Sequence, residues 1–130
     1  MNESDPSTPP KRIFVADDDS TIMMLLEMAL EMEGFEVSCY AGADELIAAI
    51  DKAETPPHLI LTDFHLGEVN GLDLIRLARE RIPSVKTVLL SGSKQSTALS
   101  KSHVKPDAFL GKPIDLDTLT ATVEALFAEG

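Results

Sequence analysis

Short apolar runs alternate along this chain with longer segments that have the period of an amphipathic helix, and this alternation constrains the fold most. Short continuous apolar runs are typical of strands covered on both faces of a sheet, whereas apolar residues three and four apart indicate helices. Strands are predicted at residues 13–16, 35–39, 59–62, 87–90 and 108–110. Helices are predicted at residues 21–33, 44–52, 71–81 and 116–127.

This order of elements predicts an α/β fold, a doubly wound five-stranded parallel sheet with helices on both faces. Ser20 is expected to be the N-cap of the first helix, and Asp115 that of the last. The segment 92–106 has little apolar content, so a fourth helix there is expected to be short or frayed.

The length of 130 residues fits one domain. Three prolines among the first ten residues predict a flexible N-terminal arm over residues 1–11, followed by one domain over residues 12–130. A net charge of −11 argues against nucleic-acid and membrane partners. The single cysteine, Cys39, excludes an internal disulfide and favours a reducing, cytoplasmic location.

Polar residues follow the predicted strands at the ends where parallel sheets bind their ligands. The first strand is followed by three aspartates at residues 17–19, and the others by Asp63, Ser91 and Lys112. Neighbouring carboxylates repel one another, and Mg²⁺ would relieve that repulsion. A bound Mg²⁺ would favour an incoming phosphoryl group, so the pattern predicts phosphoryl transfer to a carboxylate.

Four motifs in this order resemble the response-regulator receiver domain of two-component signalling. They are IFVADDDS, LILTDFHLGEVNGLDLI, VLLSGS and FLGKPI, and the resemblance runs from about Arg12 to the end of the chain. It implies a flavodoxin-like sheet of strand order 2-1-3-4-5. It also implies a phosphoprotein, similar to the single-domain chemotaxis regulators of bacteria.

The resemblance assigns the metal-binding and acceptor roles. Asp63 would accept the phosphoryl group and contribute to the Mg²⁺ site. Asp18 would ligate Mg²⁺ directly, Asp17 through water or a weaker contact, and His65 through its backbone carbonyl.

The same resemblance indicates which residues would contact the phosphoryl group and which residue would act as a conformational switch. Ser91 and Lys112 would contact the phosphoryl group, and the bond before Pro113 would be cis. Phe109 would be the switch residue whose rotamer follows Ser91. As an alternative, Phe109 is an ordinary core residue.

Two segments depart from the family pattern. The loop after Asp63 has Gly67 and Asn70 where the family usually has proline and aspartate, and residues 104–108 replace the usual Gly-Ala. These departures affect the loop and the output face, not the predicted phosphorylation site.

Met24, Met28 and Met32 recur every four residues on the first helix, away from its inner face. One interpretation is simple exposure at the helix edge. The other is a docking patch for a helical partner, because methionine suits adaptable interfaces.

The expected function is that of a single-domain response regulator. It would receive phosphate from a histidine kinase or histidine phosphotransfer protein and act on an unknown output protein, since too few residues are expected after the last helix for a DNA-binding or enzymatic output domain. One alternative is a haloacid-dehalogenase-type phosphatase, with Asp17 as nucleophile and Asp19 as general acid. Another is a pseudo-receiver, a binding module that never carries phosphate.

Overall fold

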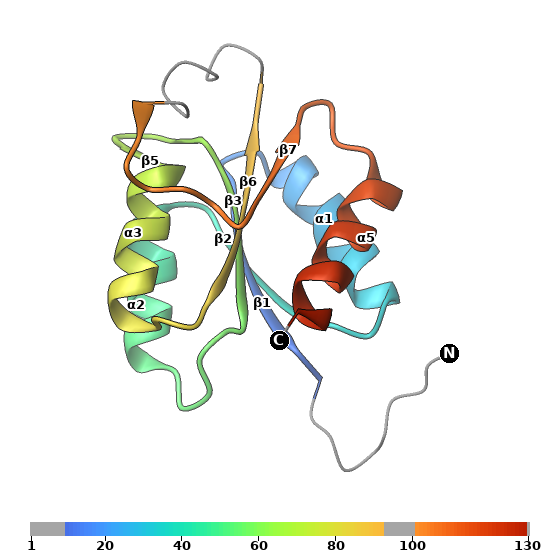
Figure 1. Cartoon of the computed structure of the whole chain (residues 1–130), viewed down its shortest axis with the longest axis horizontal. Coiled ribbons are helices and arrows are strands. Elements are labelled where there is room, and N and C mark those ends of the chain that lie inside the picture. Colours follow the sequence, from blue (N-terminus) through green and yellow to red (C-terminus); the bar gives the residue numbers. More distant parts are fainter. Residues whose placement is uncertain (1–9, 93–100, 130) are drawn as a thin grey trace.

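The computed structural model describes residues 10–92 and 101–129. Its centre is a five-stranded parallel sheet of order β2-β1-β3-β6-β7, which confirms the predicted fold class and strand order. The strands are β1 (Arg12–Ala16), β2 (Glu36–Tyr40), β3 (Leu59–Asp63), β6 (Lys86–Ser91) and β7 (Ala108–Gly111). Figure 1 shows the sheet nearly edge-on, with the strands running upwards.

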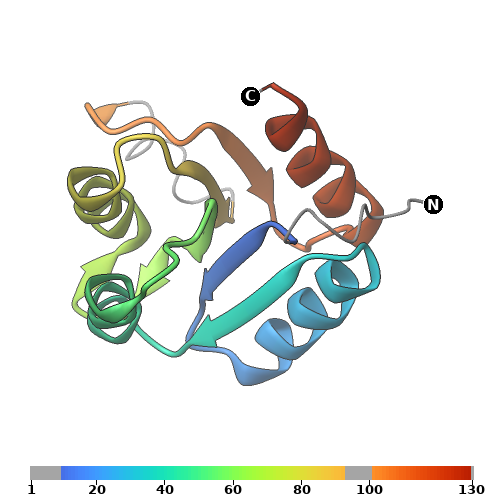
Figure 2. The ribbon, with the colours of Figure 1, turned by 90° about the horizontal axis from the view of Figure 1, so that it is seen from below.

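Helices cover both faces of the sheet, as Figures 1 and 2 show. The described helices are α1 (Ser20–Met32) and α5 (Leu116–Ala128) on one face, and α2 (Ala43–Lys52) and α3 (Gly71–Arg81) on the other. The predicted fourth helix falls mainly on residues 93–100, which lie outside the described residues. Within the described ranges, no helix is long and apolar enough to cross a membrane.

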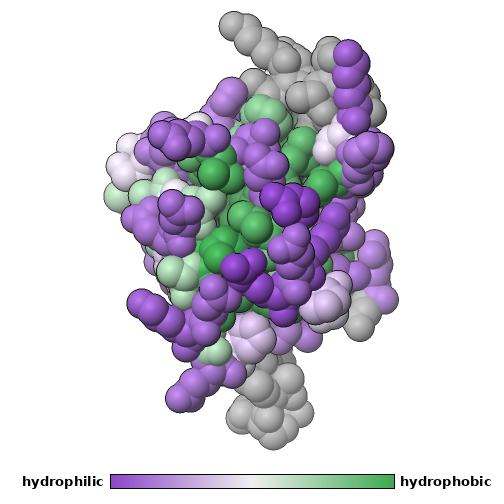
Figure 3. Space-filling model, turned by 90° about the vertical axis from the view of Figure 1, so that its left-hand side faces the viewer, coloured by the Kyte–Doolittle hydropathy of each residue, from purple (hydrophilic) through white to green (hydrophobic). Residues whose placement is uncertain are grey.

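The hydrophobic core has two layers because successive residues of a strand point to opposite faces of the sheet. In β1, Ile13 and Val15 pack with the α1 and α5 side, whereas Phe14 and Ala16 pack with the α2 and α3 side. Figure 3 views the molecule from the α2 and α3 side, where hydrophilic side chains surround a central hydrophobic strip. The outer faces of these helices are thus solvated while their inner faces are buried.

The first helix begins one residue earlier than the sequence predicts. Its N-cap is Asp19 and not Ser20, because the Asp19 carboxylate accepts the N–H groups of Thr21 at 3.0 Å and Ile22 at 3.2 Å. Aspartate and serine are comparable caps, so sequence alone could not separate them. The prediction for α5 is confirmed, since Asp115 accepts the N–H of Thr118 at 3.0 Å.

The loop after β3 forms a small hairpin that the sequence analysis did not predict. Strands β4 (His65–Leu66) and β5 (Val69–Asn70) pair in antiparallel orientation around a two-residue turn. Gly67 occupies the first turn position with a φ of 79°, a conformation that glycine adopts without steric cost. The side chain of Asn70 then caps α3 by accepting the N–H of Asp73 at 2.9 Å.

A polar network anchors the segment before β7. The Asp107 carboxylate accepts the N–H of buried Thr87 at 2.8 Å and its hydroxyl at 3.0 Å. Arg79 of α3 donates to the Thr87 hydroxyl at 3.1 Å and to the carbonyl of Lys105 at 2.7 Å. The unusual residues before β7 therefore connect that strand to both β6 and α3.

Gly71, the first residue of α3, lies against the end of β3. Its N–H donates to the carbonyl of Phe64 at 2.7 Å. A Cβ atom at this position would clash with the backbone carbonyl of Asp63 and lie 2.7 Å from Cδ1 of Leu89. The start of α3 can approach the strand end this closely only because residue 71 has no side chain.

We therefore predict that Gly71→Ala lowers the free energy of unfolding by about 1–3 kcal/mol, the usual cost of overpacking. Urea unfolding followed by circular dichroism would measure the change. Gly111→Ala is the matched control, because a Cβ atom there would meet nothing within 4 Å. Equal losses in the two variants would contradict the steric explanation.

Candidate functional site

Three carboxylates meet where β1 and β3 end. These strand ends lie at the top of the sheet in the view of Figure 1. Asp17 and Asp18 follow β1, and Asp63 is the last residue of the neighbouring strand β3. Asp17 and Asp63 are buried, whereas Asp18 is exposed. One carboxylate oxygen from each residue lies within 4.8 Å of the other two. The parallel register of β1 and β3 thus brings together acids that are far apart in the sequence.

The Asp17 carboxylate is buried and only half satisfied. Its Oδ1 accepts the N–H of Asp19 at 2.9 Å, whereas the buried Oδ2 has no hydrogen-bond partner in the described part of the chain. Burial raises the pKa of Asp17, and the charge of Asp63 raises it further. Leaving a buried oxygen unpaired is costly, and a cation at this edge would supply the missing partner.

Lys112 brings a positive charge to the cluster from the far strand. It follows β7, and its Nζ lies 2.7 Å from Oδ1 of Asp63. Burial lowers the pKa of Lys112, but the hydrogen bond and charge of Asp63 outweigh this effect and raise it overall. The bond from Lys112 to Pro113 is cis, as the resemblance implied. One ammonium group faces three carboxylates, so the cluster remains acidic.

Ser91 lies at the same edge, between the strands that carry Asp63 and Lys112. It is the buried last residue of β6, one residue after Leu90, which is paired with Asp63. Its hydroxyl donates to the carbonyl of Gly92 at 3.0 Å, and its own carbonyl accepts the N–H of Lys112 at 2.9 Å. The backbone therefore fixes Ser91 beside the acidic cluster.

His65 follows the acidic cluster in the chain, and Phe109 lies within β7, two residues before that strand ends. His65 is an exposed residue of β4, two positions after Asp63, and its ring contacts that of Phe64 edge-on at 5.1 Å. Phe109 of β7 is paired with Leu89 and is 47% exposed. Its neighbours Ala108 and Leu110 pack into the α1 and α5 side of the core, whereas Phe109 does not. The alternative of an ordinary core phenylalanine is therefore wrong.

The three methionines form a separate surface on α1. Met24, Met28 and Met32 are exposed by 58%, 54% and 83%. Met28 and Met32 line a hollow of about 270 Å³ that includes Leu25 and Leu116. Leu25 and Leu116 also line a second hollow, which reaches Lys112. The apolar surface therefore extends from the methionines towards the acidic edge.

The acidic cluster has the donor set of a Mg²⁺ site. Its ligand atoms are carboxylate oxygens, which this hard cation prefers, and the unpartnered Oδ2 of Asp17 is one of the candidates. Asp17, Asp18 and Asp63 thus fit the metal that the sequence pattern predicts.

The same geometry bears on the phosphatase alternative. That hypothesis requires Asp19 to act as a general acid beside a nucleophilic Asp17. Instead, the exposed Asp19 carboxylate accepts two backbone N–H groups at the start of α1. It is occupied as a helix cap, and Asp63 joins Asp17 in the cluster.

Known proteins with similar sequences include two bacterial regulatory proteins. The chain is 32% identical over 117 residues to the acid tolerance regulatory protein ActR of Sinorhizobium medicae, covering 88% of this chain and 59% of that protein. It is 31% identical over 121 residues to the photosynthetic apparatus regulatory protein RegA of Cereibacter sphaeroides, covering 92% and 63%. The chain spans less than two thirds of the length of these relatives.

A solved structure with the same fold is the CheY-like response regulator receiver domain protein of Methanospirillum hungatei. It superimposes with a TM-score of 0.81 at 29% identity, over 92% of this chain and 95% of that one. The sequence profile of the response regulator receiver domain matches residues 13–124. The chain therefore belongs to the family of response regulator receiver domains.

Proposed function

We propose that this chain accepts a phosphoryl group on Asp63 from a phosphorylated histidine of a kinase or phosphotransfer protein. The observation that carries the proposal is the contact between Nζ of Lys112 and Oδ1 of Asp63 at 2.7 Å, within a cluster of two further carboxylates. A lone carboxylate beside a lysine is an ordinary ion pair. Three carboxylates that share one ammonium group carry excess negative charge, which favours binding of a cation. That cation would in turn attract an anionic substrate.

The transfer forms one bond and breaks another. A carboxylate oxygen of Asp63 attacks phosphorus, and the nitrogen–phosphorus bond of the donor breaks. The histidine nitrogen keeps the electron pair, and the product is a mixed carboxylic–phosphoric anhydride on Asp63. The ammonium group of Lys112 would stabilise the negative charge that develops on the phosphoryl oxygens. The Ser91 hydroxyl, which donates to the carbonyl of Gly92, would turn to donate a hydrogen bond to a phosphoryl oxygen.

Asp17, Asp18 and Asp63 would hold Mg²⁺, together with the backbone carbonyl of His65. When bound, Mg²⁺ neutralises the carboxylates and the phosphoryl oxygens, so that two anionic groups can meet. Asp17 is held by the N–H of Asp19, which orients its second oxygen. The carboxylate ligands are therefore already in place before a phosphoryl donor binds.

The chain would signal through protein contacts, as a single-domain regulator or a relay component. The methionine surface on α1 would receive the helical phosphotransfer partner, because it is exposed and its apolar hollows lead to Lys112. The half-exposed Phe109 would change rotamer when Ser91 turns towards the phosphoryl group. The output protein would recognise that change on the surface around β7.

Asp63→Asn should abolish phosphorylation by acetyl phosphate in the presence of Mg²⁺, because a neutral amide replaces the nucleophilic carboxylate. Intact mass spectrometry would detect the added phosphoryl group in the wild type and its absence in the variant. Peptide mapping of the labelled wild type would identify the modified aspartate. A label on Asp17 would instead support the phosphatase alternative, and an unlabelled wild type would support the pseudo-receiver.

Asp17→Asn should raise the free energy of unfolding in metal-free buffer at pH 7, by about 1–3 kcal/mol. The substitution keeps an oxygen for the Asp19 N–H and removes a buried charge. Because folding raises the pKa of Asp17 above 3.8, its ionisation makes the wild type less stable as pH rises through that value. The advantage of the variant should therefore disappear below about pH 3.8.

Urea unfolding across pH would measure this difference. Added Mg²⁺ should stabilise the wild type more than Asp17→Asn, because a ligand that binds only the folded state stabilises it more when it binds more tightly. A variant that is less stable than the wild type without metal at pH 7 would contradict the proposed electrostatic cost.

Met24→Glu combined with Met28→Glu should slow phosphoryl transfer from the histidine donor but leave labelling by acetyl phosphate unchanged. The substitutions place charge on the proposed docking surface without touching the acidic cluster. Phosphotransfer kinetics with a radiolabelled donor would measure the difference. Arg76→Glu on α3, across the sheet, is the exposed control. Equal loss in both labelling assays would indicate a folding defect rather than a docking surface.

A further inference from the structure

Helices α1 and α5, which cover one face of the sheet (Figure 1), carry acidic residues and no basic ones. Neither helix contains a lysine, arginine or histidine. Their acidic residues, together with the C-cap of α1, are called here the acidic rim: Glu27, Glu31, Glu33, Asp117 and Glu124. Within residues 10–92 and 101–129, no carboxylate of the acidic rim forms an ion pair. The negative charge on this face is therefore uncompensated.

The helices on the other face of the sheet have a different charge pattern. Helices α2 and α3 contain Lys52, Arg76, Arg79 and Arg81. Each of the three arginines forms an ion pair with a carboxylate, at 3.0, 3.5 and 2.8 Å. Among the helices that the structure describes, positive charge is thus confined to the α2 and α3 face.

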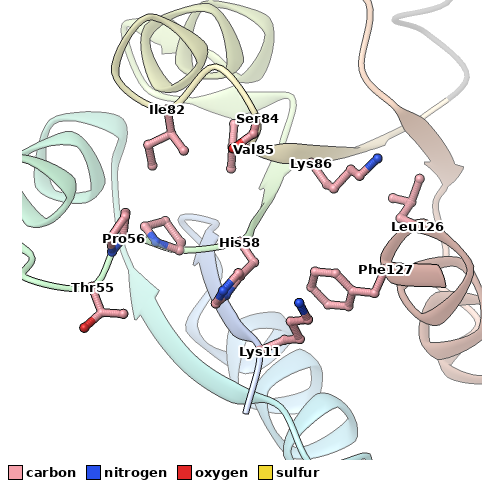
Figure 4. A pocket seen from close by; sticks show the side chains of 11 residues that line it. Lys11, Thr55, Pro56, His58, Ile82, Ser84, Val85, Lys86, Leu126 and Phe127 are labelled. Atoms are coloured by element: carbon pink, nitrogen blue, oxygen red, sulfur yellow. The ribbon is translucent and has the colours of Figure 1, made fainter. Parts of the chain in front are cut away.

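Two basic residues lie near the end of α5, but their ammonium groups have other contacts. Figure 4 shows Lys11 and Lys86 beside Phe127, in a pocket at the end of the sheet where the strands begin. Nζ of Lys11 lies over the Phe127 ring, 5.8 Å from its centre. Nζ of Lys86 lies 3.7 Å from Oε1 of Glu129. These two cations therefore belong to the far end of the molecule and leave the acidic rim unpaired.

Glu27 and Glu31 border the methionine surface on the side towards β2. They are four residues apart, so they lie on the same side of α1. Burial raises the pKa of Cys39 in β2 to about 11, with further contributions from the charges of Glu27 and Glu31. This influence on Cys39 places both carboxylates along the β2 flank of the helix.

Glu33, Asp117 and Glu124 border the same surface on the side towards α5. Glu33 and Asp117 line the hollow of about 270 Å³ together with Met28 and Met32. A side-chain hydrogen bond with Glu33 raises the pKa of Glu124, and burial and the charge of Glu33 add to this effect. Two carboxyl groups in contact indicate an excess of negative charge along this flank. The methionine surface is thus an apolar stripe with carboxylates on both sides.

We propose that the methionine surface binds a partner helix whose apolar face is bordered on both sides by lysine or arginine residues. The apolar side chains would pack against the methionines, whose flexible thioethers adapt to different shapes. The basic side chains would lay their apolar stems along the stripe and direct their charges to the acidic rim. This inference rests on the proposed docking of the histidine donor and adds the chemistry that its helix must have.

Charges at the rim of an interface act mainly on the association rate and on the choice of partner. A basic helix would be attracted to this face before contact, whereas an acidic helix with the same apolar face would be repelled. The acidic rim would therefore select among donors that share an apolar docking face.

The test uses as probe a synthetic helical peptide of about 20 residues, long enough to form a helix. Leucines three and four apart form its apolar face, and lysines border that face. Titration into the ¹⁵N-labelled chain should give saturable amide shifts centred on residues 24–33 and 116–124. A peptide with glutamates in place of the lysines should bind at least about tenfold more weakly. A peptide with serines in place of the leucines should also bind more weakly.

Variants of the chain test the acidic rim itself. Glu27→Gln combined with Glu31→Gln should weaken binding of the lysine peptide about three- to tenfold. Asp44→Asn combined with Glu54→Gln is the matched control, because it removes the same charge from exposed positions at α2 and just after it. The preference for lysine should fall as NaCl rises from about 0.05 M to about 0.5 M, because the Debye length shortens from about 14 Å to about 4 Å.

Three outcomes would overturn the inference. Equal binding of the lysine and glutamate peptides would mean that only the apolar stripe contributes. Equal weakening by the two double variants would mean that the peptide responds to the net charge of the chain and not to the acidic rim. Shifts centred on the edge that carries Asp63, or on α2 and α3, would place the peptide elsewhere.

Labelling of Asp63 by acetyl phosphate requires no helical donor, so it tests the proposed phosphoryl transfer separately. A chain that is labelled but shows no preference for the lysine peptide would overturn the inference about the partner and leave Asp63 as the acceptor. A chain that prefers the lysine peptide but is not labelled would support the inference about the surface and overturn the proposed phosphoryl transfer.

Discussion

Mutual repulsion among Asp17, Asp18 and Asp63 is the constraint on which the functional end of this molecule depends. The carboxylates are held together by the pairing of β1 with β3, whose apolar residues are buried on both faces of the sheet. Hydrophobic burial over five strands is a large free energy compared with the cost of a few close charges. The fold can therefore impose an unfavourable arrangement on its acidic edge, and Lys112 relieves only part of it.

The elements that could be predicted from the sequence are those governed by local pattern. The helix 71–81 is observed at its predicted bounds because its apolar period is regular and Pro83 follows it. The convergence of Asp63 and Lys112 was also predictable, because the ends of parallel strands meet at one edge. These successes share a cause, since hydrophobic periodicity and strand direction are both readable from residue order.

The sequence analysis missed features that depend on contacts between residues distant in sequence, or on a choice between two residues that are equally suited to one role. The β4–β5 hairpin has strands of two residues, too short for a periodic signal, although Gly67 marks its turn. The network of Arg79, Thr87 and Asp107 joins three elements and leaves no local pattern. Asp19 replaces Ser20 as the cap because the choice depends on which residue keeps an extended backbone.

The unusual loop after the acidic edge can be understood from the same geometry. Gly71 places the start of α3 against the carbonyl of Asp63, so the intervening chain must reverse direction within a few residues. A two-residue turn at Gly67 accomplishes that reversal, and Asn70 then caps the helix that Gly71 begins. Gly67 and Asn70 are departures from the usual family pattern, yet each satisfies a requirement of this chain. The departures therefore concern how the loop is built, whereas Asp63, on which the proposed phosphoryl transfer depends, is the last residue of β3 and lies before that loop.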